Sequence, residues 1–197
     1  MSAERFFRPF FDRVGAPPAM RRFVLEELSS PARAWHGLLH HALMLRALGK
    51  GDHAPGDMRR LILATLFHDI VYDARRADNE ERSVEVAAAW LDPDDAAAVG
   101  PLILATKRHD LHADPPTRAL LMADLNVLWT SSAALYGFYA RGIRAEYAHV
   151  PDETYRVGRA AVLGALRDQL RAELDSARGS ALDRNLDREL ASLRAGT

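Results

Sequence analysis

The chain contains no cysteine, which excludes both a disulfide framework and thiolate ligands for a metal ion. Long apolar runs are also missing, because none reaches the roughly 20 residues needed to span a bilayer. The N-terminus places charged residues among its aromatic ones and lacks the apolar core of a signal peptide. We therefore expect a cytoplasmic protein without a membrane partner, in which any metal ion is held by His, Asp or Glu.

A surplus of charge of one sign is absent as well, since 26 Lys and Arg residues are balanced by 27 Asp and Glu residues. The sequence has no obvious basic face, so we do not expect long nucleic acid as a partner, whereas a small anionic ligand is compatible. Lysine occurs only at Lys50 and Lys107, so the positive charge is nearly all arginine. Arginine suits carboxylates and phosphates, but a genome rich in Arg and Ala explains the bias as easily, and we favour that explanation.

Strand-like alternation is missing too, and apolar residues recur at helical spacing between clusters of Pro and Gly. We predict an all-α bundle of about nine or ten helices. The 197 residues fit one domain, 1–197, with a core of ordinary size. Its last helix, about 172–194, is expected to be solvated. A homodimer is the default expectation, because symmetric dimers are the commonest oligomers.

The expected helices follow the proline and glycine breaks. Asp78 and Glu81 have the spacing of a capping box. Three aromatic residues, Tyr136, Phe138 and Tyr139, are expected to pack in the core. The expected ranges are 3–14, 18–30, 35–49, a buried helix through His68 and Asp69, 79–91, 94–108, a helix from Pro115 that carries Asp124, 132–149, a helix from Pro151, and 172–194.

Two acidic residues interrupt apolar segments and need a physical explanation. Asp69 lies in residues 67–73, Phe-His-Asp-Ile-Val-Tyr-Asp, after the apolar run 61–67. Asp124 lies in the apolar stretch 119–129. A helix that is apolar all round is buried, and an unpaired carboxylate there costs several kcal/mol unless a cation or a proton neutralises it. One metal ion would compensate both acids.

Histidines stand in positions that supply further ligands. His36 and His40 are four residues apart, which puts them on one face of the expected helix. With His41 adjacent, we expect one of the three to face solvent or to pack in the core. Together with His68-Asp69 and Asp124, the helix offers a His, His, Asp, Asp set, which suits Mn, Fe, Co, Ni or Zn and is compatible with Mg.

This ordered set resembles the pattern of metal-dependent HD-domain phosphohydrolases, all-helical proteins named for a His-Asp pair. The resemblance implies an HD-domain-like orthogonal helical bundle. It also implies that His40, His68, Asp69 and Asp124 hold a divalent metal ion. The chain is similar, more closely, to a bacterial subfamily of small single-domain HD phosphohydrolases, over most of residues 30–165. The similar segments are Trp35-His36 to His40, 67–73, 78–83, 123–125, 144–147, 149–150 and 158–159.

The resemblance leaves the catalytic acid or base open. Some HD nucleotidases have a glutamate three residues after the dyad, where this chain has Tyr72. Asp69 is expected to act at the site, and Asp73 or Glu80 would then take the acid or base role. Asp73 stands four residues after Asp69 and could instead orient ligands or cap a helix. Glu80 is expected near a helix N-terminus, whose dipole favours bound phosphate, or simply in solvent.

His109 is similar in position to the histidines with which two-metal HD proteins hold a second ion, so one or two ions per chain are expected. A histidine at a helix C-terminus is also ordinary dipole compensation, which we favour for His112. For substrate phosphate the candidates are Arg144, Lys107 and Asn79. Other arginines that could serve, Arg33 and Arg159 among them, are individually more typical of the surface or of ion pairs.

The function that these expectations favour is hydrolysis of a small phosphate ester, with a nucleotide as the favoured substrate, by a metal-activated water. One alternative is an HD-type di-iron oxygenase, which would need His36, His109 and His112 as further ligands. Another alternative is a non-catalytic, metal-containing protein that binds a nucleotide or has a regulatory role. A small phosphorylated substrate is the expected partner in the leading hypothesis.

Overall fold

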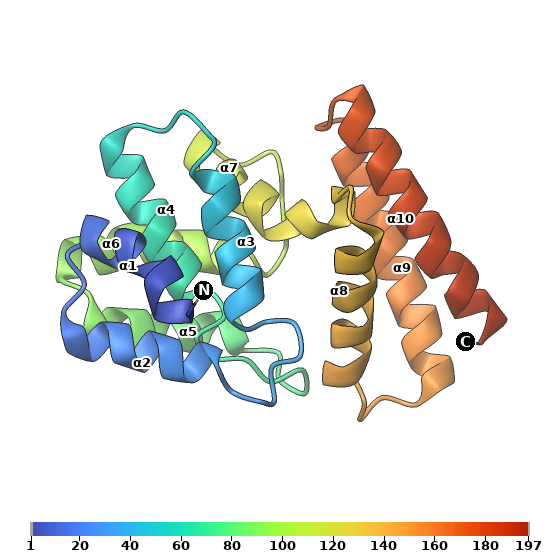
Figure 1. Cartoon of the computed structure of the whole chain (residues 1–197), viewed down its shortest axis with the longest axis horizontal. Coiled ribbons are helices and arrows are strands. Elements are labelled where there is room, and N and C mark those ends of the chain that lie inside the picture. Colours follow the sequence, from blue (N-terminus) through green and yellow to red (C-terminus); the bar gives the residue numbers. More distant parts are fainter. Residues whose placement is uncertain (1, 197) are drawn as a thin grey trace. The chain divides into compact units, whose positions relative to one another are not determined.

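The computed structural model describes residues 2–196, and regular structure in that range is helical, with no strand. Ten α-helices and one short 3₁₀ helix in this range confirm the prediction of an all-α bundle of about nine or ten helices (Figure 1). The elements are α1 (Ala3–Arg13), α2 (Pro18–Leu28), α3 (Leu38–Leu48), α4 (Pro55–Phe67), α5 (Asn79–Trp90), α6 (Pro93–Ala105), α7 (Pro115–Asp124), η1 (Leu125–Trp129), α8 (Ala133–Glu146), α9 (Asp152–Arg171) and α10 (Ser176–Ala195).

The chain divides into two compact units, Met1–Leu125 and Asn126–Thr197. The first unit contains α1 to α7, and the second contains α8 to α10. Each unit has its own buried residues. The expectation of one domain over residues 1–197 stays a prediction.

Helix α4 lies at the centre of the first unit, where it contacts α3, α5, α6 and α7. Met58 and all residues from Leu61 to Phe67 are buried, so the helix is covered on every side, as its apolar sequence predicts. Pro55 occupies its first turn, where the missing N–H removes no helical hydrogen bond. Burying each large apolar side chain contributes about 1.5–3 kcal/mol, which makes α4 a rigid support for the segment after its C-terminus.

The His-Asp pair lies just beyond α4 rather than inside a helix, which corrects the placement expected from sequence. The helix ends at Phe67, and His68 is the C-cap residue. Asp69 follows in an irregular segment that runs to residue 73. The backbone of this segment bonds to side chains from elsewhere in the first unit in place of helical partners.

The expected helix 35–49 begins only at Leu38, so the assignment of His36 to the same helical face as His40 was wrong. Gly37 is the N-cap residue, with an extended backbone. A Cβ at this position would lie 2.9 Å from the carbonyl oxygen of Leu28, so the close approach of the two segments favours glycine here. His36 therefore belongs to the connection before α3, although its ring still meets the His40 ring edge-on, with centroids 5.6 Å apart.

Smaller corrections concern helix ends. Helix α6 ends at Ala105 rather than near 108, and α8 ends at Glu146 rather than near 149. Asp78 makes no capping hydrogen bond and no capping box forms, because its carboxylate pairs with Arg76 and Arg82. Ser132 caps α8, since its hydroxyl accepts from the Leu135 amide.

The second unit packs α8, α9 and α10 against one another, with α10 in contact with both other helices. Leu182, Leu186 and Glu189 on α10 are buried, so the expectation of a solvated terminal helix was wrong. Tyr136 and Tyr139 are buried as predicted, but Phe138 is 45% exposed, which corrects the expectation that it packs in the core.

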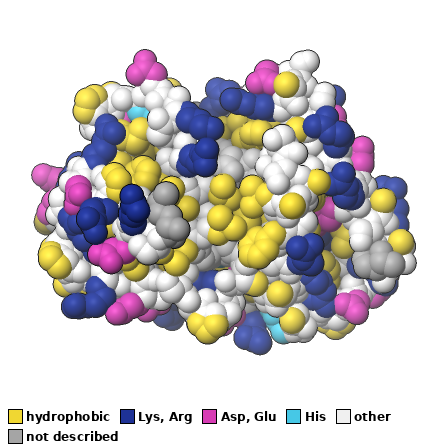
Figure 2. Space-filling view, viewed as in Figure 1, with side chains coloured by type: hydrophobic (Ala, Val, Ile, Leu, Met, Phe, Trp, Pro, Cys, Tyr) yellow, Lys and Arg dark blue, Asp and Glu magenta, His cyan; other side chains and the backbone are white. Residues whose placement is uncertain are grey.

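No helix within residues 2–196 combines the length and the apolar character needed to cross a bilayer. On the face shown in Figure 2, Lys and Arg side chains lie in scattered groups among apolar and acidic ones.

Candidate metal centre

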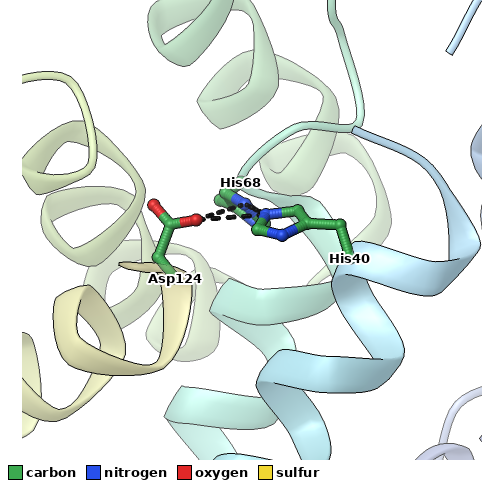
Figure 3. A group of neighbouring side chains, drawn as sticks. All are labelled: His40, His68 and Asp124. Carbon is green, nitrogen blue, oxygen red and sulfur yellow. Dashed lines mark hydrogen bonds and ion pairs between the residues drawn. The ribbon is translucent and has the colours of Figure 1, made fainter. Parts of the chain in front are cut away.

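Three elements of the first unit bring a group of His and Asp side chains together (Figure 3). His40 comes from the first turn of α3, His68 from the C-cap of α4, and Asp124 from the last position of α7. Each of the three offers one ligand atom, and these atoms lie within 4.8 Å of one another. Asp69 adjoins this group as the residue after His68.

The ligand atoms are spaced as an ion would require. The Nε2 atoms of His40 and His68 are 3.2 Å apart, and His40 Nε2 is 3.1 Å from Asp124 Oδ1. Asp69 Oδ2 is 3.1 Å from His68 Nε2 and 3.8 Å from His40 Nε2. Ligands about 2.1 Å from one ion lie about 3.0 Å apart at octahedral angles and about 3.4 Å apart at tetrahedral angles. Three of these pairs have such a spacing, whereas His40–Asp69 at 3.8 Å and His68–Asp124 at 3.9 Å are wider, so the group could hold a divalent ion.

The group is almost closed to solvent. His40 and His68 are only 2% and 1% exposed, while the Asp69 and Asp124 side chains retain 14% and 13%. Two carboxylates and two imidazoles in such a place require a compensating positive charge. Protons on the histidines or a metal ion can supply it.

The neighbouring charges and the burial shift the pKa values of the group in different directions. Burial disfavours the charged form of His68, but the neighbouring Asp69 and Asp124 carboxylates outweigh it and raise the pKa of His68 to about 9. Burial, by contrast, dominates at His40 and lowers its pKa. Burial would raise the pKa of Asp69, but the charge and hydrogen bond of His68 lower it overall. A metal ion would take over the role of the His68 proton.

A backbone contact fixes the orientation of His68. Its Nδ1 lies 3.0 Å from the carbonyl oxygen of Thr65, which can only accept, so Nδ1 carries the hydrogen. In the neutral ring, Nε2 then has a free lone pair directed at His40 and Asp69. Metal-binding histidines are commonly oriented by a hydrogen bond of this kind.

His41 is the histidine of the cluster that packs in the core. It is fully buried, and its Nδ1 donates to the carbonyl oxygen of Gly37 at 2.9 Å. Burial lowers its pKa well below the usual value, so the ring is neutral. Its Nε2 has no hydrogen-bond partner among the described residues. His41 thus confirms the expectation that one of the three histidines packs in the core.

His109 contacts the opposite oxygen of Asp124. His109 Nε2 lies 2.8 Å from Asp124 Oδ2, while Oδ1 of the same carboxylate faces His40. Burial opposes ionisation of Asp124, but the hydrogen bonds from His109 and His40 hold its pKa well below the usual range. His109 has φ 51°, a left-handed conformation that costs a non-glycine residue about 1–3 kcal/mol. The strain coincides with a residue that contacts the candidate ligand.

The residues predicted for catalysis and substrate binding make local contacts. The Asn79 side chain bonds to the backbone of Asp73, whose amide donates to Asn79 Oδ1 at 3.1 Å. Glu80 lies 3.9 Å from Lys107 Nζ, which donates to the carbonyl oxygen of Ala77 at 2.6 Å. No hydrogen bond or ion pair found among the described residues joins these four side chains to His40, His68 or Asp124, and their catalytic and substrate roles stay predictions.

Arg144 belongs to the second unit, near the end of α8. Its guanidinium pairs with Asp152 at 2.5 Å and donates to the carbonyl oxygen of Tyr147 at 2.7 Å. These contacts join α8 to the connection before α9. The contact of Arg144 with substrate phosphate stays a prediction.

Sequence reasoning missed the residues that hold the segment after the dyad. Arg33, considered only as one of several phosphate-binding candidates, donates to the carbonyl oxygens of Asp69 and Ile70. Ser83 bonds to the backbone of Val71. The four-residue spacing of Asn79 and Ser83 was the available signal, because it places both on one face of α5.

Comparisons of the chain with profiles of protein families, with curated proteins and with solved structures found no match. The candidate site is therefore defined by its own geometry: a buried group of His40, His68 and Asp124, adjoined by Asp69 and His109, that could hold a metal ion.

Proposed function

We propose that this protein is a metal-dependent phosphohydrolase of the HD-domain type, which hydrolyses a small phosphate ester, with a nucleotide as the favoured substrate. The single observation that carries the proposal is the convergence of His40 Nε2, His68 Nε2 and Asp124 Oδ1 beside Asp69. The order of these residues along the chain is the one that suggested the HD resemblance.

The residues of the site have separable roles in the proposed reaction. His40, His68, Asp69 and Asp124 would hold the ion, and their mixed nitrogen and oxygen donors suit Mn, Fe, Co, Ni or Zn. When bound, a divalent ion polarises the phosphoryl oxygen and lowers the pKa of the attacking water. His109 fixes the second oxygen of Asp124 or ligates a second ion.

Proton transfer and charge neutralisation fall to residues outside this group. Asp73 or Glu80 would accept the proton of the attacking water, provided that substrate binding brings one of them within hydrogen-bond reach. Asn79 and Lys107, near the N-terminus of α5, are proposed to contact the phosphate. These assignments would be tested one residue at a time, since each side chain also has a local structural contact.

The di-iron oxygenase alternative is less well supported. It would need His36, His109 and His112 as additional ligands. His109 hydrogen-bonds to Asp124. His36 stacks on Tyr72 with ring centroids 4.1 Å apart, and its charge also acts on Asp69. His112 is exposed and is engaged through its backbone amide with Asp110.

The test is elemental analysis of protein purified without a metal-chelating tag, followed by a screen of nucleotides and other phosphate esters with several divalent ions. We expect bound metal and release of phosphate from at least one substrate. Replacing Asp69 with Ala should abolish both. A wild-type protein that binds metal but consumes oxygen, or that is inert and stabilised by one nucleotide, would favour the oxygenase or the non-catalytic alternative respectively.

A further inference from the structure

The segment 69–73 carries Asp69 but lacks the hydrogen bonding of regular structure. Helix α4 ends at Phe67, so the carbonyl groups of Asp69 and Ile70 have no helical partner. A buried polar backbone group that loses its partner costs about 1–3 kcal/mol. The conformation of this segment therefore depends on the side chains that bond to it.

Helix α5 provides two of these side chains. The Val71 amide donates to Ser83 Oγ at 3.2 Å, and the same hydroxyl donates to the Val71 carbonyl oxygen at 3.3 Å. The Asp73 amide donates to Asn79 Oδ1, and Asn79 Nδ2 donates back to the Asp73 carbonyl oxygen at 3.0 Å. Both side chains bond the N–H and the C=O of one residue, as a neighbouring strand would. They hold the far end of the segment.

Arg33 holds the end that carries Asp69. Its Nη1 donates to the carbonyl oxygen of Asp69 at 2.5 Å and its Nη2 to that of Ile70 at 2.8 Å. Nη1 also donates to the carbonyl oxygen of His36 at 3.0 Å. One guanidinium thus ties the segment after α4 to the connection that leads into α3.

This tie joins the two stretches of backbone that carry three of the candidate ligands. His40 stands near the start of α3, and His68 and Asp69 stand at the end of α4. Ring contacts reinforce the same junction, since the Arg33 guanidinium lies over the Tyr72 ring, 6.0 Å from its centroid, and Tyr72 stacks on His36. A change in the spacing of the two stretches would move Asp69 Oδ2 relative to His40 Nε2.

We propose that Arg33 is a positioning residue of the metal centre, which holds Asp69 and the start of α3 in the relative placement that lets their side chains share one ion. This inference rests on the proposed function, because it gives Arg33 a role only where an ion is bound. It assigns to Arg33 backbone recognition instead of contact with substrate phosphate.

The chemistry of the guanidinium makes the proposal specific. Its nitrogen atoms form a planar fork that donates to three carbonyl oxygens at once, whereas lysine offers one flexible ammonium group. Arg33→Lys therefore keeps the charge and loses the fork. Removing a residue that orients metal ligands typically weakens metal binding about 10–100-fold.

The experiment compares Co²⁺ binding by the wild type, Arg33→Met, Arg33→Lys and a control, Arg59→Met. Arg59 belongs to the same unit, donates to the carbonyl oxygen of Val14 and pairs with Asp95, so it makes a comparable tie away from the site. Affinity is measured by competition with a chelator, and the visible absorption of bound Co²⁺ reports its coordination. Hydrogen–deuterium exchange of residues 69–73 is measured without metal.

We expect both Arg33 variants to bind Co²⁺ about 10–100-fold more weakly with an altered spectrum. They should also exchange faster at residues 69–73, while Arg59→Met binds as the wild type does. Equal losses in Arg33→Met and Arg59→Met, or wild-type affinity, spectrum and exchange in a folded Arg33→Lys, would overturn the role of Arg33. Wild-type protein that binds no Co²⁺ would overturn the proposed metal function, and the Arg33 role with it. If Arg33→Met does not fold, the Co²⁺ affinity, spectrum and exchange of Arg33→Lys alone test the role of Arg33.

Discussion

Each unit of the molecule buries a group of ionisable side chains, and the two groups differ in how their charges are compensated. In the second unit, Arg159 donates to Glu189 at 2.8 Å and to Tyr139 at 2.8 Å, and Tyr136 donates to Glu189 at 2.5 Å. Each of these donors has an acceptor, and one positive charge meets one negative charge.

The first unit has no such balance. There, the carboxylates of Asp69 and Asp124 are paired with histidine rings, which are charged only when protonated, so the group becomes neutral only with added protons or a cation. Burial of charge is common to both units. Buried carboxylates without a permanently charged partner point to a ligand, and four experiments can test this contrast.

The largest expected effect is on stability, in the second unit. Glu189→Ala leaves the buried Arg159 guanidinium unpaired, which should lower the free energy of unfolding by about 3–5 kcal/mol. Urea denaturation measures the loss. The double variant Arg159→Met, Glu189→Leu should recover most of it, because replacing a whole buried ion pair with apolar residues is often neutral. A double variant as unstable as Glu189→Ala would show that apolar residues cannot replace the ion pair in stabilising this unit.

The second prediction concerns metal binding in the first unit. Asp124→Ala removes the carboxylate that contacts both His40 and His109, and should weaken Co²⁺ binding by at least about 100-fold, measured by calorimetry. The matched control is Asp95→Ala. Asp95 is similarly buried, at 15% exposure, but pairs with Arg59. Comparable losses in both variants would mean that burial of an acid, rather than its place in the group, accounts for the effect.

The buried acids of the first unit were predictable from the sequence, because the residues next to them along the chain indicate burial. Asp69 and Asp124 are recognisable because an acid within an apolar run signals burial without knowledge of the partner. The ten helices follow from apolar spacing and proline breaks in the same way. The placement of the dyad beyond α4 was not predictable, because the end of that helix is set by bonds from Arg33, Asn79 and Ser83.

Partners that lie far apart along the chain cannot be identified from the sequence. Arg33 is one arginine among many, and nothing in its neighbours indicates carbonyl groups 36 and 37 residues away. Arg159 and Glu189 likewise pair across 30 residues, so their burial could not be read from either segment. Patterns identify groups that are costly to bury, whereas the fold decides which groups compensate them.

The third prediction uses the metal as a ligand of the folded state. Adding Co²⁺ at about 100 times its dissociation constant should raise the free energy of unfolding of the wild type by about 2.7 kcal/mol. The Glu189→Ala variant should gain the same amount, because its defect lies in the other unit. At the same Co²⁺ concentration, Asp124→Ala should gain no more than about 0.4 kcal/mol. A gain by Asp124→Ala equal to that of the wild type would place the bound ion elsewhere.

The smallest expected effect separates two roles of His109. Glycine adopts the left-handed conformation at little cost, so His109→Gly relieves backbone strain while it removes the contact with Asp124. Its stability should therefore stay within about 1 kcal/mol of the wild type, while Co²⁺ affinity falls about 10-fold. His112→Ala, which changes an exposed histidine three residues away, should alter neither.

The stoichiometry then decides what His109 does. If it only fixes Asp124, His109→Gly binds the same number of ions as the wild type, each more weakly. If it ligates a second ion, the wild type binds two ions per chain and the variant binds one. Wild-type affinity together with wild-type stoichiometry in His109→Gly would remove His109 from the site. The left-handed backbone at residue 109 would then need an explanation in the fold alone, since φ 51° is costly for any residue with a side chain.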